Sequence, residues 1–126
     1  MDGPGRKRPV ALTCPTCGGA VRQTVERDLP NFTCHLGHCF AADEMDEAQI
    51  YGTRRVLETA LRMFNERAEL ARRLAATQRK RGKLVSAEHW EATTREMDAA
   101  AEVLRCLLER GWRSPSPERS GTAGPT

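Results

Sequence analysis

Four cysteines and two histidines lie close together in the N-terminal third of the chain, and their spacing is typical of a metal site. Cys14 and Cys17 are separated by two residues and followed by two glycines, which defines a first knuckle at residues 14–19. Such a pair turns both sulfur atoms toward one point, and the glycines let the backbone fold tightly beneath an ion. Cys34 follows Cys17 after 16 residues, within the roughly 15–20 residues expected when a β-hairpin returns to the same ion. The pattern predicts a zinc site.

The fourth ligand comes from a second knuckle at residues 34–39, where spacing alone leaves a choice among His35, His38 and Cys39. His35 would have to curl back on its own backbone, whereas His38 and Cys39 leave enough chain for a turn around Gly37. We favour the following set of ligands: Cys14, Cys17, Cys34 and His38. Cys39 is the close alternative, and His35 is a second one. Four protein ligands leave no open position for water, so the predicted ion is structural and not catalytic.

The composition limits what else the chain can be. Its 126 residues are 39% hydrophobic and only 5% aromatic, which fits one domain or slightly less and argues against a large enzyme core. Metal binding and helix pairing would then supply much of the order. No run of about 18 apolar residues exists and the N-terminal sequence MDGPGRKRPVAL has no apolar signal core, so we expect a cytoplasmic protein without membrane contact. Cysteines in a zinc pattern also suit a reducing compartment.

A small β structure is expected to carry the two knuckles. Residues 20–27 read AVRQTVER, and residues 28–31 have turn chemistry, so a short hairpin should connect the knuckles. Phe32 and Phe40 flank the second knuckle and should cover the ion. We therefore predict a zinc ribbon over residues 10–42.

The rest of the ordered chain has helical periodicity. We predict helices at about residues 43–80 and 86–110, with Ser86 as the N-cap of the second. The predicted seam residues follow steps of three and four: Leu57, Leu61, Phe64, Ala68, Ala71 and Ala75 in the first helix, and Ala87, Trp90, Thr94, Met97, Ala101, Leu104 and Leu108 in the second. Residues 43–111 should form a coiled-coil-like antiparallel hairpin. The predicted fold class is α with a small β zinc ribbon.

Charge is separated along the chain although the net charge is only +3. Ten Lys and Arg residues oppose three acidic residues between Arg54 and Lys83, and six acidic residues oppose three arginines between Leu84 and Arg110. Two packed helices of opposite charge would explain this separation without an outside partner. By composition, residues 1–9 and 112–126 are expected to be a disordered arm and a disordered tail.

Three sequence segments carry a resemblance to a known family. The segments CPTCGG, FTCHLGHCF and ETALRMFNERAELARRLA resemble the C-terminal extension of some proteins of the chemotaxis protein-glutamate methylesterase family. The resemblance covers roughly residues 13–110, and its most specific element is the CHxGH pattern. The matching positions are Cys14, Cys17, Cys34 and His38, which supports His38 as the fourth ligand, and His35 matches as well. The family's esterase domain has no counterpart here, because no nucleophile turn or βαβ pattern is present.

These observations favour a non-catalytic zinc-binding module that binds another protein. The resemblance implies a role accessory to bacterial chemotaxis or two-component signalling, and the helical hairpin would also allow a homo-oligomer. The alternative is a zinc-ribbon regulator that binds nucleic acid through the basic long helix. We favour protein binding, because the acidic second helix gives the arginines an internal use. An enzyme is not expected, since neither an open metal position nor an isolated acid/base pair is evident.

Overall fold

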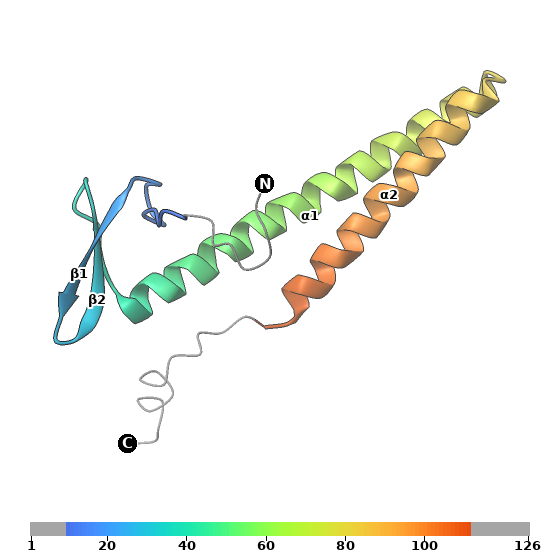
Figure 1. The fold of residues 1–126 in the computed structure, drawn as a ribbon. Helices are drawn as coiled ribbons and strands as arrows, with labels where there is room; N and C mark the ends of the chain where they lie inside the picture. The colour runs from blue at the N-terminus through green and yellow to red at the C-terminus, as the bar shows by residue number, and fades with distance from the viewer. Residues whose placement is uncertain (1–9, 112–126) are drawn as a thin grey trace, which may run out of the picture. The chain divides into compact units, whose positions relative to one another are not determined.

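The structure is a computed structural model and describes residues 10–111, so the segments expected to be disordered, 1–9 and 112–126, lie outside the described residues. The elements are these: β1 (Val21–Glu26), β2 (Leu29–Cys34), β3 (Cys39–Ala41), α1 (Ala42–Lys80) and α2 (Leu84–Glu109) (Figure 1). The chain divides into two compact units, and the division falls between Ile50 and Tyr51, inside α1. We call described residues 10–50 the sheet unit and residues 51–111 the hairpin unit.

The sheet unit contains the predicted hairpin and one further strand. β1, β2 and β3 form an antiparallel sheet in that order. The turn between β1 and β2 is two residues long, because Arg27 and Asp28 both adopt positive φ, as a type I′ turn requires. The prediction of a turn over residues 28–31 was therefore wrong in its bounds, because residues 29–31 belong to β2. Pro30 lies in the part of β2 that extends beyond β3, where its missing N–H costs that strand no hydrogen bond.

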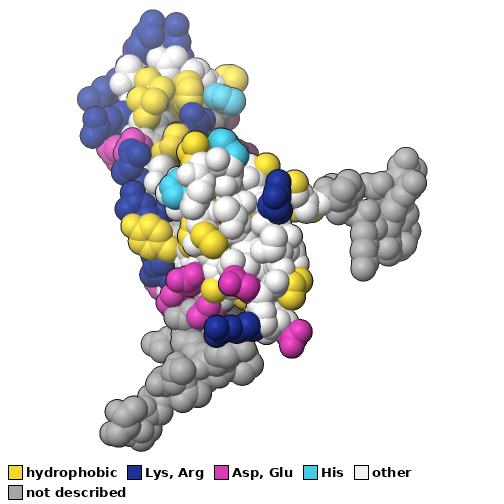
Figure 2. All heavy atoms as spheres, turned by 90° about the vertical axis from the view of Figure 1, so that its left-hand side faces the viewer, with side chains coloured by type: hydrophobic (Ala, Val, Ile, Leu, Met, Phe, Trp, Pro, Cys, Tyr) yellow, Lys and Arg dark blue, Asp and Glu magenta, His cyan; other side chains and the backbone are white. Residues whose placement is uncertain are grey.

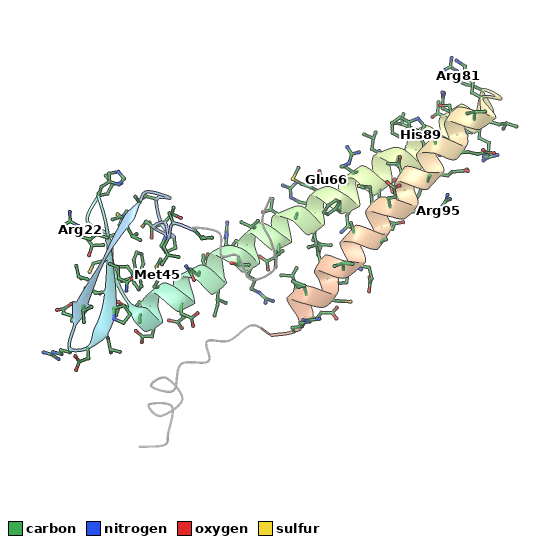
Figure 3. All side chains as sticks on the ribbon, viewed as in Figure 1. Arg22, Met45, Glu66, Arg81, His89 and Arg95 are labelled. Carbon is green, nitrogen blue, oxygen red and sulfur yellow. The ribbon has the colours of Figure 1, made fainter. Side chains whose placement is uncertain are left out.

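The core of the sheet unit is small and lies around the second knuckle. Its buried side chains are Cys14, Phe32, Cys34 and Met45. Phe32 pairs with Phe40 across β2 and β3, and Phe40 is half-buried. Met45 lies where the first turns of α1 adjoin the sheet (Figure 3), and only 4% of its surface is exposed. An apolar cover of this size is thin, so an ion is expected to contribute much of the stability of this unit.

The hairpin unit is formed by α2 packed antiparallel on α1, and this confirms the predicted fold class (Figure 1). Its buried residues are all alanines on the predicted seam: Ala68, Ala71, Ala75, Ala87 and Ala101. The larger seam residues, including Leu61, Phe64 and Trp90, remain partly exposed. Alanines let two helix backbones approach closely, but a pair of helices cannot enclose a large side chain on all sides. Among the described residues, no helix combines the length and apolar character that a membrane span requires.

The turn between the helices corrects one prediction, because Ser86 is not the N-cap of α2. Gly82 adopts a left-handed φ of 76° and its N–H bonds to the carbonyl oxygen of Arg79, while the N–H of Lys83 bonds to that of Gln78. This pattern is a Schellman motif, which ends α1 and redirects the chain within one turn. α2 then starts at Leu84, with Lys83 at the N-cap position and no side-chain cap. Ser86 instead accepts a hydrogen bond from Gln78 at 2.9 Å.

Ion pairs connect the two helices along one flank of the hairpin. The guanidinium of Arg79 contacts both carboxylate oxygens of Glu91 at 2.8 Å, and Arg72 contacts Asp98 at 3.2 Å. Each pair is about half exposed, so it is worth roughly 0.2–1 kcal/mol. Within α1, hydrogen bonds from Arg73 and Arg72 lower the pKa of Glu69. Lys and Arg side chains also gather at the hairpin turn, at the top of the view in Figure 2.

Candidate metal centre

The first knuckle is a tight turn that brings Cys14 and Cys17 together. The N–H of Gly18 bonds to the carbonyl oxygen of Cys14 at 2.7 Å, and the N–H of Cys14 bonds to that of Gly19, also at 2.7 Å. Gly18 adopts a left-handed φ of 78°, a conformation that glycine reaches without steric cost. The left-handed conformation at this position therefore explains why a glycine directly follows Cys17.

Hydrogen bonds within this knuckle adjust the acidity of its two thiols. Burial alone would raise the pKa of Cys14, but the backbone N–H groups of Cys17 and Thr16 outweigh it, and the pKa is lowered. For Cys17, the backbone N–H of Gly19 acts to lower the pKa, while burial and the neighbouring sulfur atoms of Cys14 and Cys34 act to raise it, and the pKa is raised. This is expected where several thiols share one site, because they cannot all ionise easily without a cation.

The second knuckle connects β2 to β3 and, like the first, contains two backbone hydrogen bonds and a left-handed glycine. The N–H of Gly37 bonds to the carbonyl oxygen of Cys34 at 3.0 Å, and the N–H of Cys34 bonds to that of His38 at 2.9 Å. Gly37 has a left-handed φ of 95°. Burial would raise the pKa of Cys34, but the N–H groups of Leu36 and His38 outweigh it and lower this pKa. The turn thus stabilises a thiolate and points the His38 ring at it.

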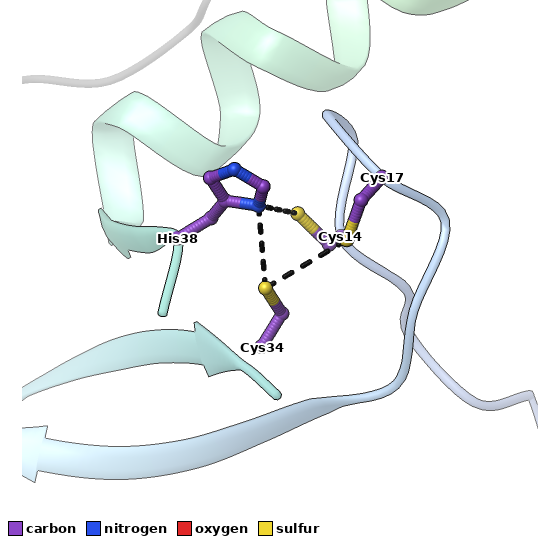
Figure 4. A group of neighbouring side chains, drawn as sticks. All are labelled: Cys14, Cys17, Cys34 and His38. Atoms are coloured by element: carbon purple, nitrogen blue, oxygen red, sulfur yellow. Dashed lines mark hydrogen bonds between the residues drawn. The ribbon is translucent and has the colours of Figure 1, made fainter. Parts of the chain in front are cut away.

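The two knuckles meet and place three sulfur atoms and one imidazole nitrogen around one point (Figure 4). The four donor residues are Cys14, Cys17, Cys34 and His38, and their ligand atoms all lie within 4.8 Å of one another. The Sγ atoms of Cys17 and Cys34 are 3.7 Å apart. Nδ1 of His38 lies 3.6 Å from Sγ of Cys14 and 3.3 Å from Sγ of Cys34.

These distances fit a tetrahedral zinc ion. With Zn–S bonds of about 2.3 Å and Zn–N bonds of about 2.0–2.1 Å, tetrahedral angles place two sulfur atoms about 3.8 Å apart and a sulfur and a nitrogen about 3.6 Å apart. The observed spacings lie within a few tenths of an ångström of these values. Three thiolates and one imidazole are also a donor set typical of structural zinc. The cluster could therefore hold a metal ion such as zinc.

The two alternative ligands lie elsewhere. Sγ of Cys39 contacts the side chains of Thr33 at 3.4 Å and Asn31 at 3.5 Å, and Cys39 is exposed. The ring of His35 lies against Gly19, where an added Cβ would overlap it, and His35 is exposed. Among the described residues, neither side chain joins the group of four donors. Spacing had left this choice open because all three candidates lie within five residues of Cys34.

One residue in the core of the sheet unit was not predicted from the sequence. Met45 is among the most buried residues of the sheet unit, although it lies in an acidic stretch at the start of α1. It is the one apolar residue in the run Asp43–Glu47, and this isolation was an available signal. A thioether is flexible enough to fill an irregular gap in a small core.

Comparison of the chain with protein-family models, with curated proteins and with solved structures found no match. The assignment of a metal centre therefore depends on the geometry and chemistry of the four donors.

Two glycine-to-alanine variants should change stability in opposite directions. Gly18→Ala places a Cβ on a left-handed residue of the first knuckle, so we expect a loss of roughly 1–2 kcal/mol. Gly52 lies inside α1, has open space at its Cβ position and carries no positive φ, so Gly52→Ala should add about 0.5–1 kcal/mol. Urea unfolding of the zinc-loaded proteins measures both values. Equal shifts of the same sign would contradict the assigned backbone conformations.

Proposed function

We propose that this protein contains a non-catalytic zinc-binding module whose role is to bind another protein. The observation that carries the proposal is the convergence of four protein donors on one point. A tetrahedral ion held by four side chains has no coordination position left for water or substrate, so the ion would hold the two knuckles together without activating a nucleophile. The sheet unit would then present a rigid surface of three short strands.

The signalling context of the proposal comes from the resemblance to the extension of chemotaxis protein-glutamate methylesterases. Four of the positions that match that extension converge in the structure: Cys14, Cys17, Cys34 and His38. His35 also matches, but it does not join this group among the described residues. An accessory module in chemotaxis or two-component signalling would act by contacting a protein of the pathway. We propose this as the class of partner.

Nucleic-acid binding is the competing role, and the ion pairs of the hairpin unit weigh against it. Two arginines of the basic helix, Arg72 and Arg79, contact carboxylates of α2, which reduces the charge available to phosphates. Lys80, Arg81 and Lys83 form no ion pair with a described residue, and they lie at the hairpin turn. A turn with three such cations is a small electrostatic footprint for a nucleic-acid binder.

The test is a pull-down from the native cell extract with nuclease added, using the zinc-loaded protein and its Cys34→Ser variant as bait. The matched control is Cys39→Ser, which removes an exposed thiol of the same knuckle that lies outside the donor group. We expect one protein partner that is retained at moderate salt by the parent and by Cys39→Ser, and lost by Cys34→Ser. Binding that disappears with nuclease and falls steeply with salt would instead support the nucleic-acid role.

A further inference from the structure

The two flanks of the helical hairpin differ in chemistry. On one flank, Arg72 and Arg79 of α1 pair with Asp98 and Glu91 of α2. Ion pairs therefore bridge the two helices on this flank. These pairs also fix how the helices are rotated about their axes, because paired residues of two antiparallel helices must lie on the same side. The opposite side of each helix then follows from the helical period of 3.6 residues.

The opposite flank carries a second apolar stripe on α1, and the adjoining side of α2 is mixed in character. On α1 the stripe advances in steps of four and three: Val56, Ala60, Met63, Arg67, Leu70 and Leu74. On α2 the same flank contains Thr93, Glu96, Ala100 and Val103. Four of its apolar side chains are more than half exposed: Val56 at 68%, Met63 at 54%, Leu70 at 55% and Val103 at 63%. We call these ten residues the open flank.

We propose that the open flank is a self-association surface on which a second copy of the hairpin packs to form a four-helix bundle. The spacing of the stripe on α1 is the seam spacing of a coiled coil, repeated beside the seam that α2 already covers. A helix with two adjacent seams is expected to have two neighbouring layers. In the hairpin unit the first layer is α2, and the second copy supplies the other.

The size of the open flank fits a weak dimer of this kind. From Val56 to Leu74 it is about 27 Å long at 1.5 Å per residue. Two helices with axes about 9 Å apart and bodies about 10 Å wide make it about 19 Å across. On α2 the open flank runs only from Thr93 to Val103, about 15 Å. Each copy would therefore contribute roughly 400 Å², and two copies would bury about 800 Å², an area typical of a weak contact that depends on concentration. A single docked peptide helix would cover only about half of this width.

The charges of the open flank also suit a second copy better than a lipid surface. Within the open flank, α1 carries the cation Arg67 and α2 carries the anion Glu96. Both are exposed, and neither forms an ion pair with a described residue. An anionic membrane would favour cations alone, whereas a symmetric dimer can pair one sign with the other across the interface. The inference is independent of the metal centre, since all of these residues lie in the hairpin unit.

Analytical ultracentrifugation of the full zinc-loaded chain tests the proposal. We expect a concentration-dependent monomer–dimer equilibrium for the parent protein, with a thermal midpoint that rises with protein concentration. The double variant Met63→Glu with Leu70→Glu places two negative charges from each copy in the interface and should raise the dimer dissociation constant by at least about 100-fold. Ala76→Glu with Ala99→Glu adds the same charge at exposed positions outside the open flank, and this control should remain dimeric.

Two results would overturn the proposal. The first is a parent protein that stays monomeric at the highest soluble concentration, as expected if another segment of the chain or a foreign partner covers the open flank. The second is an open-flank variant that dimerises as tightly as the control. Far-ultraviolet circular dichroism shows whether the variant has kept its helices, and the concentration dependence of the parent's melting gives an answer that needs no variant. A metal-site variant that loses its pull-down partner but still dimerises would separate this proposal from the proposed function.

Discussion

The Cys34→Ser variant is expected to lose its zinc and the fold of the sheet unit while keeping most of its helix. Apparent zinc-binding free energies of small structural sites are about 10–16 kcal/mol, and most of this is folding energy. Cys34 is buried, ends β2 and lies 3.3 Å from His38 and 3.7 Å from Cys17, so its loss removes a ligand at the centre of the group. We expect zinc affinity to fall by more than about 100-fold, since even residues outside the ligand sphere can cost 10–100-fold. The zinc content per chain after gel filtration measures the loss of the ion. The dispersion of the backbone amide NMR signals of residues 21–41 measures the loss of the sheet fold.

Two pairs of variants test which side chains of the second knuckle are metal ligands. Cys39→Ser alters the same knuckle as Cys34→Ser, and His35→Ala alters the same knuckle as His38→Ala, but Cys39 and His35 lie outside the donor group. We expect Cys39→Ser and His35→Ala to keep one zinc per chain and His38→Ala to lose it or bind it far more weakly. If His38→Ala bound zinc like the parent while Cys39→Ser released it, the assignment of the fourth ligand would be wrong.

Ala71→Leu is expected to destabilise the hairpin unit by about 1–3 kcal/mol, the usual cost of inserting methylene groups into a closely packed contact. Ala71 is buried where α1 meets α2, and a leucine there must push the helices apart or leave its preferred rotamer. Helix propensity is not the cause, because alanine and leucine are both strong helix formers. Urea unfolding followed by circular dichroism at 222 nm measures the change in the free energy of unfolding.

The matched control for this substitution is Ala76→Leu, which changes the same residue type on the exposed side of α1. We expect its effect to stay within about 0.5 kcal/mol, as is usual for surface substitutions. If both variants lost the same stability, Ala71 would not form a close contact with α2, and the assignment of the seam residues of α1 would be wrong.

Much of the fold could be predicted because its signals are local. Steps of three and four along the seam identify two helices, and Gly82 between Arg81 and Lys83 separates them. Boundaries were less certain where a backbone motif decides them. The Schellman motif at Gly82 restarts the helix at Leu84, and a serine two residues later then falls inside the first turn. Strand β3 was not anticipated, since its three residues are too few to show a period of their own.

The sequence alone predicted a metal site of the zinc type, because cysteine spacing and glycine turns are local consequences of how a short backbone segment can surround an ion. It also determined that two long amphipathic helices follow. Only the tertiary structure decided among His38, Cys39 and His35, because strand pairing directs Cys39 to Asn31 and Thr33 and leaves Nδ1 of His38 beside two sulfur atoms. The open flank was likewise decided in three dimensions. A broad apolar stripe in a sequence does not show how much of it a neighbour covers, and the interhelical ion pairs fix which side remains exposed.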